Sequence, residues 1–185
     1  MKRVMRRAAL VLAALLAFSM PPVFGAEAEL QGKAFTSTQT PSLIFRPIET
    51  RIRRQSAVPL KLPTFLPYLD EQNPIYASIG SANKSHYRII LGYGKDCEGG
   101  PTCLYAEFEG SSTPFREYTG ETRIPVALQG GIKGYFINFT CGANCSESYI
   151  GWTEGGFHYF IGMKAEKKEM LIKIANSAIG GQPQE

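Results

Sequence analysis

Histidine and aspartate are nearly absent from this chain of 185 residues, which has His86, His158, Asp70 and Asp96 and no others. These side chains supply many of the general bases and metal ligands in proteins. The sequence also lacks the motifs G-x-S-x-G and H-E-x-x-H and a phosphate-binding glycine loop. We therefore predict a non-enzymatic protein with no catalytic residue, no metal site and no cofactor.

Beyond its first 20 residues, the chain has no hydrophobic run long enough to span a membrane. Residues 1–7 are basic, residues 8–20 are apolar, and small residues follow. This order is typical of a secretory signal peptide. We predict a signal peptide over residues 1–25, with cleavage after residue 28 as the alternative. A twin-arginine signal and a retained signal anchor are further alternatives.

The basic character of the chain lies in this first segment. The full sequence has 20 Lys and Arg against 16 Asp and Glu, and four of the basic residues lie in residues 1–7. Cleavage would leave equal numbers of the two charges and no net charge. The composition therefore gives no reason to expect a nucleic-acid partner. We expect a periplasmic or secreted protein.

The four cysteines are Cys97, Cys103, Cys141 and Cys145. An even number of cysteines in an exported chain predicts disulfides. The spacings C-x5-C and C-x3-C differ from the C-x2-C of zinc knuckles and thioredoxin-like sites. A metal site and a functional redox pair are the alternatives to structural disulfides.

Geometry predicts the pairing of these cysteines. Three strand-like segments, 103–109, 122–128 and 133–139, separate the two cysteine loops. In an up-and-down sheet, an odd number of strands places two loops at opposite ends. A strand of seven residues is about 24 Å long, whereas a disulfide needs Cα atoms within about 7 Å. We therefore predict two local bridges, Cys97–Cys103 and Cys141–Cys145, each of which closes one loop.

The pattern along the chain predicts one α+β domain over residues 57–181. Residues 26–56 are polar and without a sustained period, which indicates a flexible linker with an arginine-rich run, and residues 182–185 form a tail. Four prolines in residues 57–74 exclude a long helix and a central strand. We expect that segment to be extended, or to form a single turn, and to pack across the domain.

The rest of the domain reads as an antiparallel sheet of about six strands in mainly up-and-down order. Segment 103–109 alternates with a period of two, which assigns one face to Leu104, Ala106 and Phe108 and the other, wet face to Tyr105, Glu107 and Glu109. Residues 165–181 instead have apolar residues at helical spacing, at Met170, Leu171, Ile174, Ala175 and Ala178. We predict one C-terminal amphipathic helix that packs on a face of the sheet.

The order PLKLPTFLP, C-x5-C, GIKGYFINFTCGANCS, IGW, GGFHYFIG and LIKIANSAI, within about residues 57–179, resembles small exported proteins of unknown function found mostly in cyanobacteria. The four cysteines stand where that pattern has its cysteines. The ending is also similar to DUF4367-type extracytoplasmic domains. These families carry no agreed activity, so the resemblance implies the layout and the compartment and no catalytic residue.

Two groups of residues are candidates for binding. The arginine-rich run contains Arg46, Arg51, Arg53 and Arg54, which would suit an anionic envelope polymer or lipid surface. A solvated linker is the alternative explanation for this run. The aromatic residues are dense, and some of them, with Tyr105, Tyr149 and Trp152 as candidates, would form a platform for a glycan or peptide on the less buried sheet face. Packing in the core is their alternative use.

We therefore expect an exported, non-enzymatic binding or structural module of the cell envelope, whose partner is an envelope polymer, a lipid or a protein. The alternative is a carrier, in which the sheet and helix enclose an apolar ligand as in lipoprotein carriers. A dry, apolar cavity between the helix and the sheet would favour the carrier. A filled core with an exposed aromatic face would favour the module.

Overall fold

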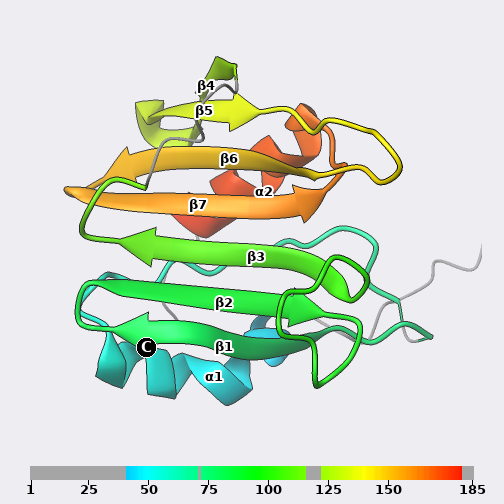
Figure 1. The fold of residues 1–185 in the computed structure, drawn as a ribbon. Helices are drawn as coiled ribbons and strands as arrows, with labels where there is room; N and C mark the ends of the chain where they lie inside the picture. The colour runs from blue at the N-terminus through cyan, green and yellow to red at the C-terminus, as the bar shows by residue number, and fades with distance from the viewer. Residues whose placement is uncertain (1–40, 71, 116–121, 181–185) are drawn as a thin grey trace, which may run out of the picture. The chain divides into compact units, whose positions relative to one another are not determined.

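The computed structural model describes residues 41–70, 72–115 and 122–180, which lie within one compact unit, Phe35–Glu185. In this part of the chain, seven strands form an antiparallel sheet with the order β1-β2-β3-β7-β6-β5-β4 (Figure 1). The predicted α+β class is confirmed, with one strand more than expected. The elements are α1 (Pro41–Gln55), β1 (Tyr76–Asn83), β2 (His86–Gly92), β3 (Leu104–Ser111), β4 (Arg123–Ala127), a 3₁₀ turn (Gln129–Gly131), β5 (Lys133–Ile137), β6 (Glu147–Glu154), β7 (Phe157–Lys164) and α2 (Lys168–Gly180).

The strand order is up-and-down except at one junction, where β3 pairs with β7 instead of β4. As a result, β3 and β4 run in the same direction, and Arg123 begins β4 beside Ile137, the last residue of β5. The loops 93–103 and 138–146 therefore lie at the same end of the sheet, on the right in Figure 1. Our expectation that they lie at opposite ends is wrong.

The two predicted disulfides are confirmed in spite of this correction. Cys97 is bonded to Cys103, with 5.7 Å between their Cα atoms, and Cys141 to Cys145, with 4.0 Å. Each bridge closes its own loop. The end of the sheet that carries both bridges is called the disulfide end below.

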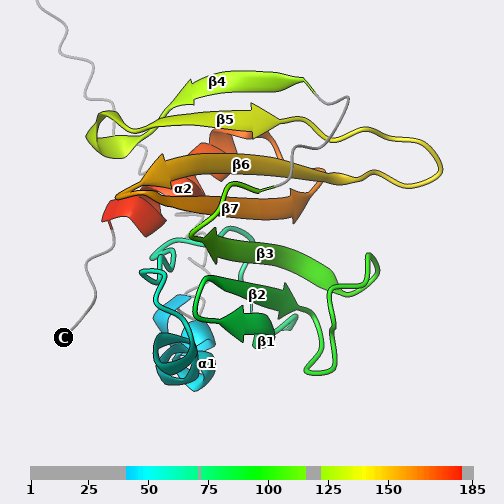
Figure 2. The same ribbon diagram turned by 60° about the vertical axis from the view of Figure 1, so that its left-hand side comes forward.

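Helix α2 packs on one face of the sheet, behind β6 and β7, as predicted (Figures 1 and 2). This face is called the inner face below, and the opposite face is called the outer face. Its apolar positions repeat every three or four residues, and its buried residues are Leu171, Ile174, Ala175 and Ala178. They share one core with Tyr159 and Ile161 of β7. This part of the molecule, α2 with the strands beneath it, is called the helix-covered face below.

Residues 41–55 form helix α1 beside β1, so the prediction of a flexible linker is wrong for this stretch (Figure 2). Its apolar side chains Ile44, Ile48 and Ile52 are four residues apart and lie in the core. Phe45 packs edge-to-face on Phe108, with 5.7 Å between the ring centroids. Burial of this apolar stripe stabilises a helix whose other face is polar. The predicted signal peptide, linker residues 26–40 and the tail lie outside the described residues.

The proline-rich segment between α1 and β1 crosses the inner face in an irregular conformation, as expected. Tyrosine hydroxyls of three strands hold its backbone. Tyr105 donates to the carbonyl of Pro67, Tyr159 donates to the carbonyl of Pro59, and Tyr87 accepts from the amide of Lys61. Burial raises the pKa of all three phenols, so each remains a neutral hydrogen-bonding group over the accessible pH range.

No helix in the described part of the chain combines the length and apolarity that a membrane span requires.

Candidate functional site

A cleft of about 750 Å³ opens at the disulfide end of the sheet. It lies where β7 ends and β3 begins, between the loops 93–103 and 138–146. Its volume is in the range of small-molecule sites, which is about 300–1,000 Å³. The lining residues come from four separate segments and are Tyr68, Tyr93, Pro101, Thr102, Leu104, Tyr105, Gly142, Ala143, Asn144, Cys145, Met163, Lys164, Ala165 and Glu166.

Hydrogen bonds fix the end of β7 to both disulfide loops. The ammonium group of Lys164 donates to the carbonyl of Pro101 over 3.1 Å, and the amide of Ala165 donates to the carbonyl of Ser146 over 3.1 Å. The hydroxyl of Ser148, which is fully buried, lies 2.6 Å from the carbonyl of Glu166. These bonds and the two disulfides restrict both walls of the cleft. A site whose walls are already ordered loses less entropy when a ligand binds.

Three tyrosines form the aromatic part of the cleft. Tyr68 and Tyr93 are 68% and 54% exposed, whereas Tyr105 is 3% exposed and forms part of the floor. The rings of Tyr93 and Tyr105 meet edge-to-face, with 5.9 Å between their centroids. Exposed aromatic rings supply large contact areas with few rotatable bonds, which is typical of binding sites.

A break in strand register places Tyr105 in this floor. Leu91 of β2 pairs with Ala106, but the next residue, Gly92, pairs with Leu104, so Tyr105 is an extra residue in β3. Such a bulge reverses the alternation of side chains. Tyr105 consequently joins the main core, and Leu104 packs with Ile90 and Cys97 on the other face. The predicted faces of Leu104 and Tyr105 are therefore wrong.

Two residues of the cleft have strained backbones. Among the described residues other than glycine, Tyr68 and Ala165 are those with a positive φ, at 55° and 50°. This left-handed conformation is unfavourable for a residue with a side chain, and strain of this kind gathers at functional sites. Both residues line the cleft. The surrounding fold therefore holds both residues in a backbone conformation that they disfavour by themselves.

Glu166 gives the cleft a buried negative charge. It is 8% exposed, and one carboxylate oxygen accepts a hydrogen bond from the amide of Lys167 over 2.8 Å. Its charge raises the pKa of the Tyr68 phenol. Glu166 and Tyr68 both line the cleft.

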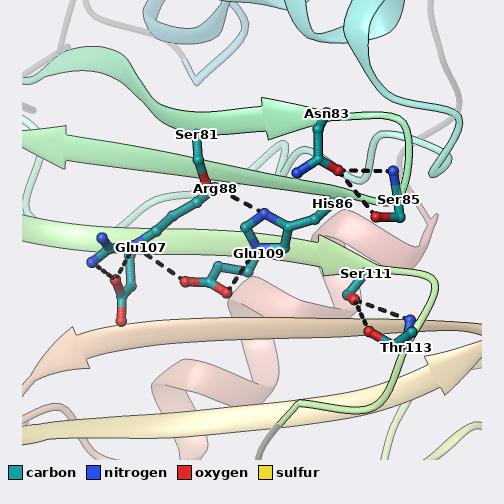
Figure 3. A network of polar contacts seen from close by, with 9 residues as sticks. All are labelled: Ser81, Asn83, Ser85, His86, Arg88, Glu107, Glu109, Ser111 and Thr113. Carbon is teal, nitrogen blue, oxygen red and sulfur yellow. Dashed lines mark hydrogen bonds and ion pairs between the residues drawn. The ribbon is translucent and has the colours of Figure 1, made fainter.

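A second polar cluster lies on the outer face of β1, β2 and β3 (Figure 3). Arg88 contacts Glu107 over 2.6 Å and Glu109 over 3.1 Å. His86 lies 3.2 Å from the other oxygen of Glu109 and 3.3 Å from the hydroxyl of Ser81. Burial raises the pKa of Glu107, although the hydrogen bond and charge of Arg88 act against it. This network joins three strands and includes His86.

The structure separates the binding candidates that the sequence suggested. Arg46, Arg51, Arg53 and Arg54 lie on the exposed face of α1, where Arg53 forms an ion pair with Glu49 over 2.8 Å. The aromatic candidates are dispersed: Tyr105 lines the cleft, Tyr149 stacks on Phe160, and Trp152 is buried and stacks on Tyr159.

The expected exposed aromatic platform is therefore wrong for Tyr105 and Trp152, because both rings contribute to the core. The cleft instead uses Tyr68 and Glu166, which the sequence did not suggest as binding residues. Neither belongs to a recognisable motif, and only the fold brings them into one cleft lining with Tyr93. The feature of the sequence that points to this cleft is the presence of tyrosines near the two cysteine loops.

No group of three or more His, Cys, Asp or Glu side chains in the described ranges has a geometry that would hold a metal ion. Comparisons of the chain with protein-family models, with curated proteins and with solved structures gave no match. The resemblance to the cyanobacterial family therefore stays an expectation from the sequence.

Proposed function

We propose that this protein is an exported, non-enzymatic binding module of the cell envelope, and that the cleft at its disulfide end is the binding site. The observation that carries the proposal is the coincidence of four features at one place. The cleft lies between both disulfide loops. It also contains two exposed tyrosine rings, a buried carboxylate and the two strained residues.

Disulfides are typical of oxidising compartments, which supports export. The N-terminal sequence supports it independently, because its basic, apolar and small-residue regions follow the order of a signal peptide. Peptide mapping of protein from the native host should find a first residue near Ala26 or Glu29. Recovery of an intact N-terminus at Met1 would contradict export with cleavage.

The alternative of an apolar carrier receives less support from the geometry. That function needs space between α2 and the sheet, but Leu171, Ile174 and Ala175 of α2 are 0% exposed and belong to the continuous core. The proposed ligand therefore binds at the end of the sheet and not beneath the helix.

The test is a comparison of what copurifies with the protein from its native envelope. Small molecules, lipids and glycans would be extracted and identified by mass spectrometry from the wild type, from a Tyr68→Ala/Tyr93→Ala variant, and from Phe65→Ala as the control. Phe65 is an exposed aromatic residue outside the cleft lining. We expect a compound that copurifies with the wild type and the control and is depleted in the double variant. Equal recovery from all three proteins would contradict the proposed site.

A further inference from the structure

The charged side chains that line the cleft are buried to different extents. Glu166 lies in the wall with 8% of its surface exposed, and in the part of the chain that the structure describes its carboxylate has no ion pair with a lysine or arginine. Lys164, the cation of the lining, is exposed and its ammonium group donates to the carbonyl of Pro101. Solvent screens an exposed charge much more than a buried one. The interior of the cleft is therefore dominated by the carboxylate.

The tyrosine rings, like the carboxylate, favour a positively charged ligand. The face of an aromatic ring carries partial negative charge and attracts cations, and the attraction increases when the site excludes water. Tyr68 lines the same cleft as Glu166, while Tyr93 meets Tyr105 edge-to-face in the floor. The buried carboxylate and the exposed rings thus favour one sign of charge in a bound ligand. An anionic ligand would be repelled by both.

We propose that the cleft recognises an organic cation, an ammonium or guanidinium group that lies against the rings of Tyr68 and Tyr93 with Glu166 as its counter-ion. This inference rests on the proposed function, since it names the ligand class of the same cleft. The volume of about 750 Å³ exceeds that of a small headgroup. The cleft therefore has room for a larger molecule that carries the cation and whose remainder lies along Ala143 and Asn144.

A pair of probes of equal shape isolates the effect of charge. Choline and its uncharged carbon analogue, 3,3-dimethylbutan-1-ol, would be titrated into the ¹⁵N-labelled mature protein at constant ionic strength. We expect choline to shift the amide signals of Tyr93, Asn144 and Ala165 and to bind at least about tenfold more tightly than the analogue. Stacking of a neutral ligand on the tyrosines would instead give similar affinities for both probes.

Two glutamine substitutions provide the matched controls. Glu166→Gln removes the charge but keeps an oxygen that can accept from the Lys167 amide. Glu169→Gln makes the same change of charge on α2, outside the cleft lining. We expect Glu166→Gln to remove most of the preference for choline and Glu169→Gln to leave it unchanged. Unchanged amide signals outside the cleft would show that each variant is folded.

The inference is overturned if the analogue binds as tightly as choline, if neither probe shifts the cleft signals, or if Glu166→Gln leaves the preference intact. None of these results would by itself contradict binding at the cleft. That proposal depends on the copurification experiment, in which Tyr68→Ala/Tyr93→Ala loses the native compound and Phe65→Ala retains it. The two failures are therefore distinguishable.

Discussion

Ile161 and Met163 lie two residues apart on the same side of β7, yet they serve different parts of the molecule. Ile161 is buried in the core of the helix-covered face, whereas Met163 also lines the cleft at the disulfide end. Around Ile161 the neighbours are apolar and enclosed. Around Met163 they include exposed tyrosines, a buried carboxylate and residues with strained backbones.

This difference indicates a division of roles within one small domain. The helix-covered face is part of the main hydrophobic core, and burial of that core stabilises the fold. The disulfide end has less apolar cover, so covalent bridges and hydrogen bonds order it instead. Substitutions in the first region should change the free energy of unfolding and spare binding. Substitutions in the second should affect binding more than stability.

The largest expected effect is that of Leu171→Ala on the helix-covered face. Leu171 is 0% exposed, so the change should lower the free energy of unfolding by about 2–5 kcal/mol through lost burial and the cavity that remains. Lys168→Ala, on the same helix but more exposed, should change it by no more than about 0.5 kcal/mol. Urea unfolding measures both. If the two variants are equally stable, α2 is not a core element.

Removal of one disulfide should have a smaller effect on stability and a clear effect on binding. In the chain-entropy model, Cys97→Ser/Cys103→Ser should lower the free energy of unfolding by about 2 kcal/mol, because the bridge closes only a short loop. The native compound should be depleted in this variant, since loop 93–103 forms one wall of the cleft. A variant that keeps full binding would show that the bridge serves stability alone.

A change at the strained residue that follows β7 should act in the opposite direction on stability. Ala165→Gly removes the side chain that makes a φ of 50° unfavourable. We expect the free energy of unfolding to rise, by up to about 1 kcal/mol, and binding to weaken because the wall becomes less ordered. Paired urea unfolding and copurification measurements would show this. Loss of stability in the variant would mean that Ala165 is not strained.

The smallest expected change concerns Glu107 on the outer face, away from both regions. Its pKa is raised above 4.5, mainly by burial, against the effect of Arg88. A raised folded-state pKa of an acid means that the folded state binds the proton more tightly. The wild type should therefore gain stability relative to Glu107→Gln as the pH falls from 7 towards 4.

Urea unfolding of the wild type and of Glu107→Gln at pH 7 and at pH 4 tests the direction of this change in relative stability. If the wild type instead loses stability relative to the variant on acidification, Arg88 outweighs burial, and the pKa of Glu107 is lowered. In that case the outer network would be an ordinary ion-pair cluster.

Much of the helix-covered face is predictable from the sequence, because local patterns encode it. The apolar spacing of α2 and the alternation along β7 are visible in the residues themselves. Helix α1 was missed because it contains Pro47 and an arginine-rich polar face, which together obscure a stripe of isoleucines spaced four apart. A proline inside a helix removes one backbone hydrogen bond, and here tertiary burial outweighs that loss.

The disulfide end is much less predictable, because non-local features assemble it. The pairing of β3 with β7 brings both cysteine loops to one end. The bulge at Tyr105 breaks the period of two that assigned its face. Neither feature has a signal that can be read within a single strand. The cysteine pairing was predicted correctly from a premise about strand order that the structure contradicts.

The most direct test of whether the cleft holds the ligand compares the amide spectra of two samples of the ¹⁵N-labelled protein. One sample is the protein as taken from its native envelope. The other is the same protein after its ligand has been removed by unfolding and refolding. We expect the amide signals of Tyr93, Asn144 and Ala165 to differ between the two samples and those of Leu171 to coincide. Differences that gather instead on α1 around Arg46 and Arg54, or two identical spectra, would contradict a binding site at the disulfide end.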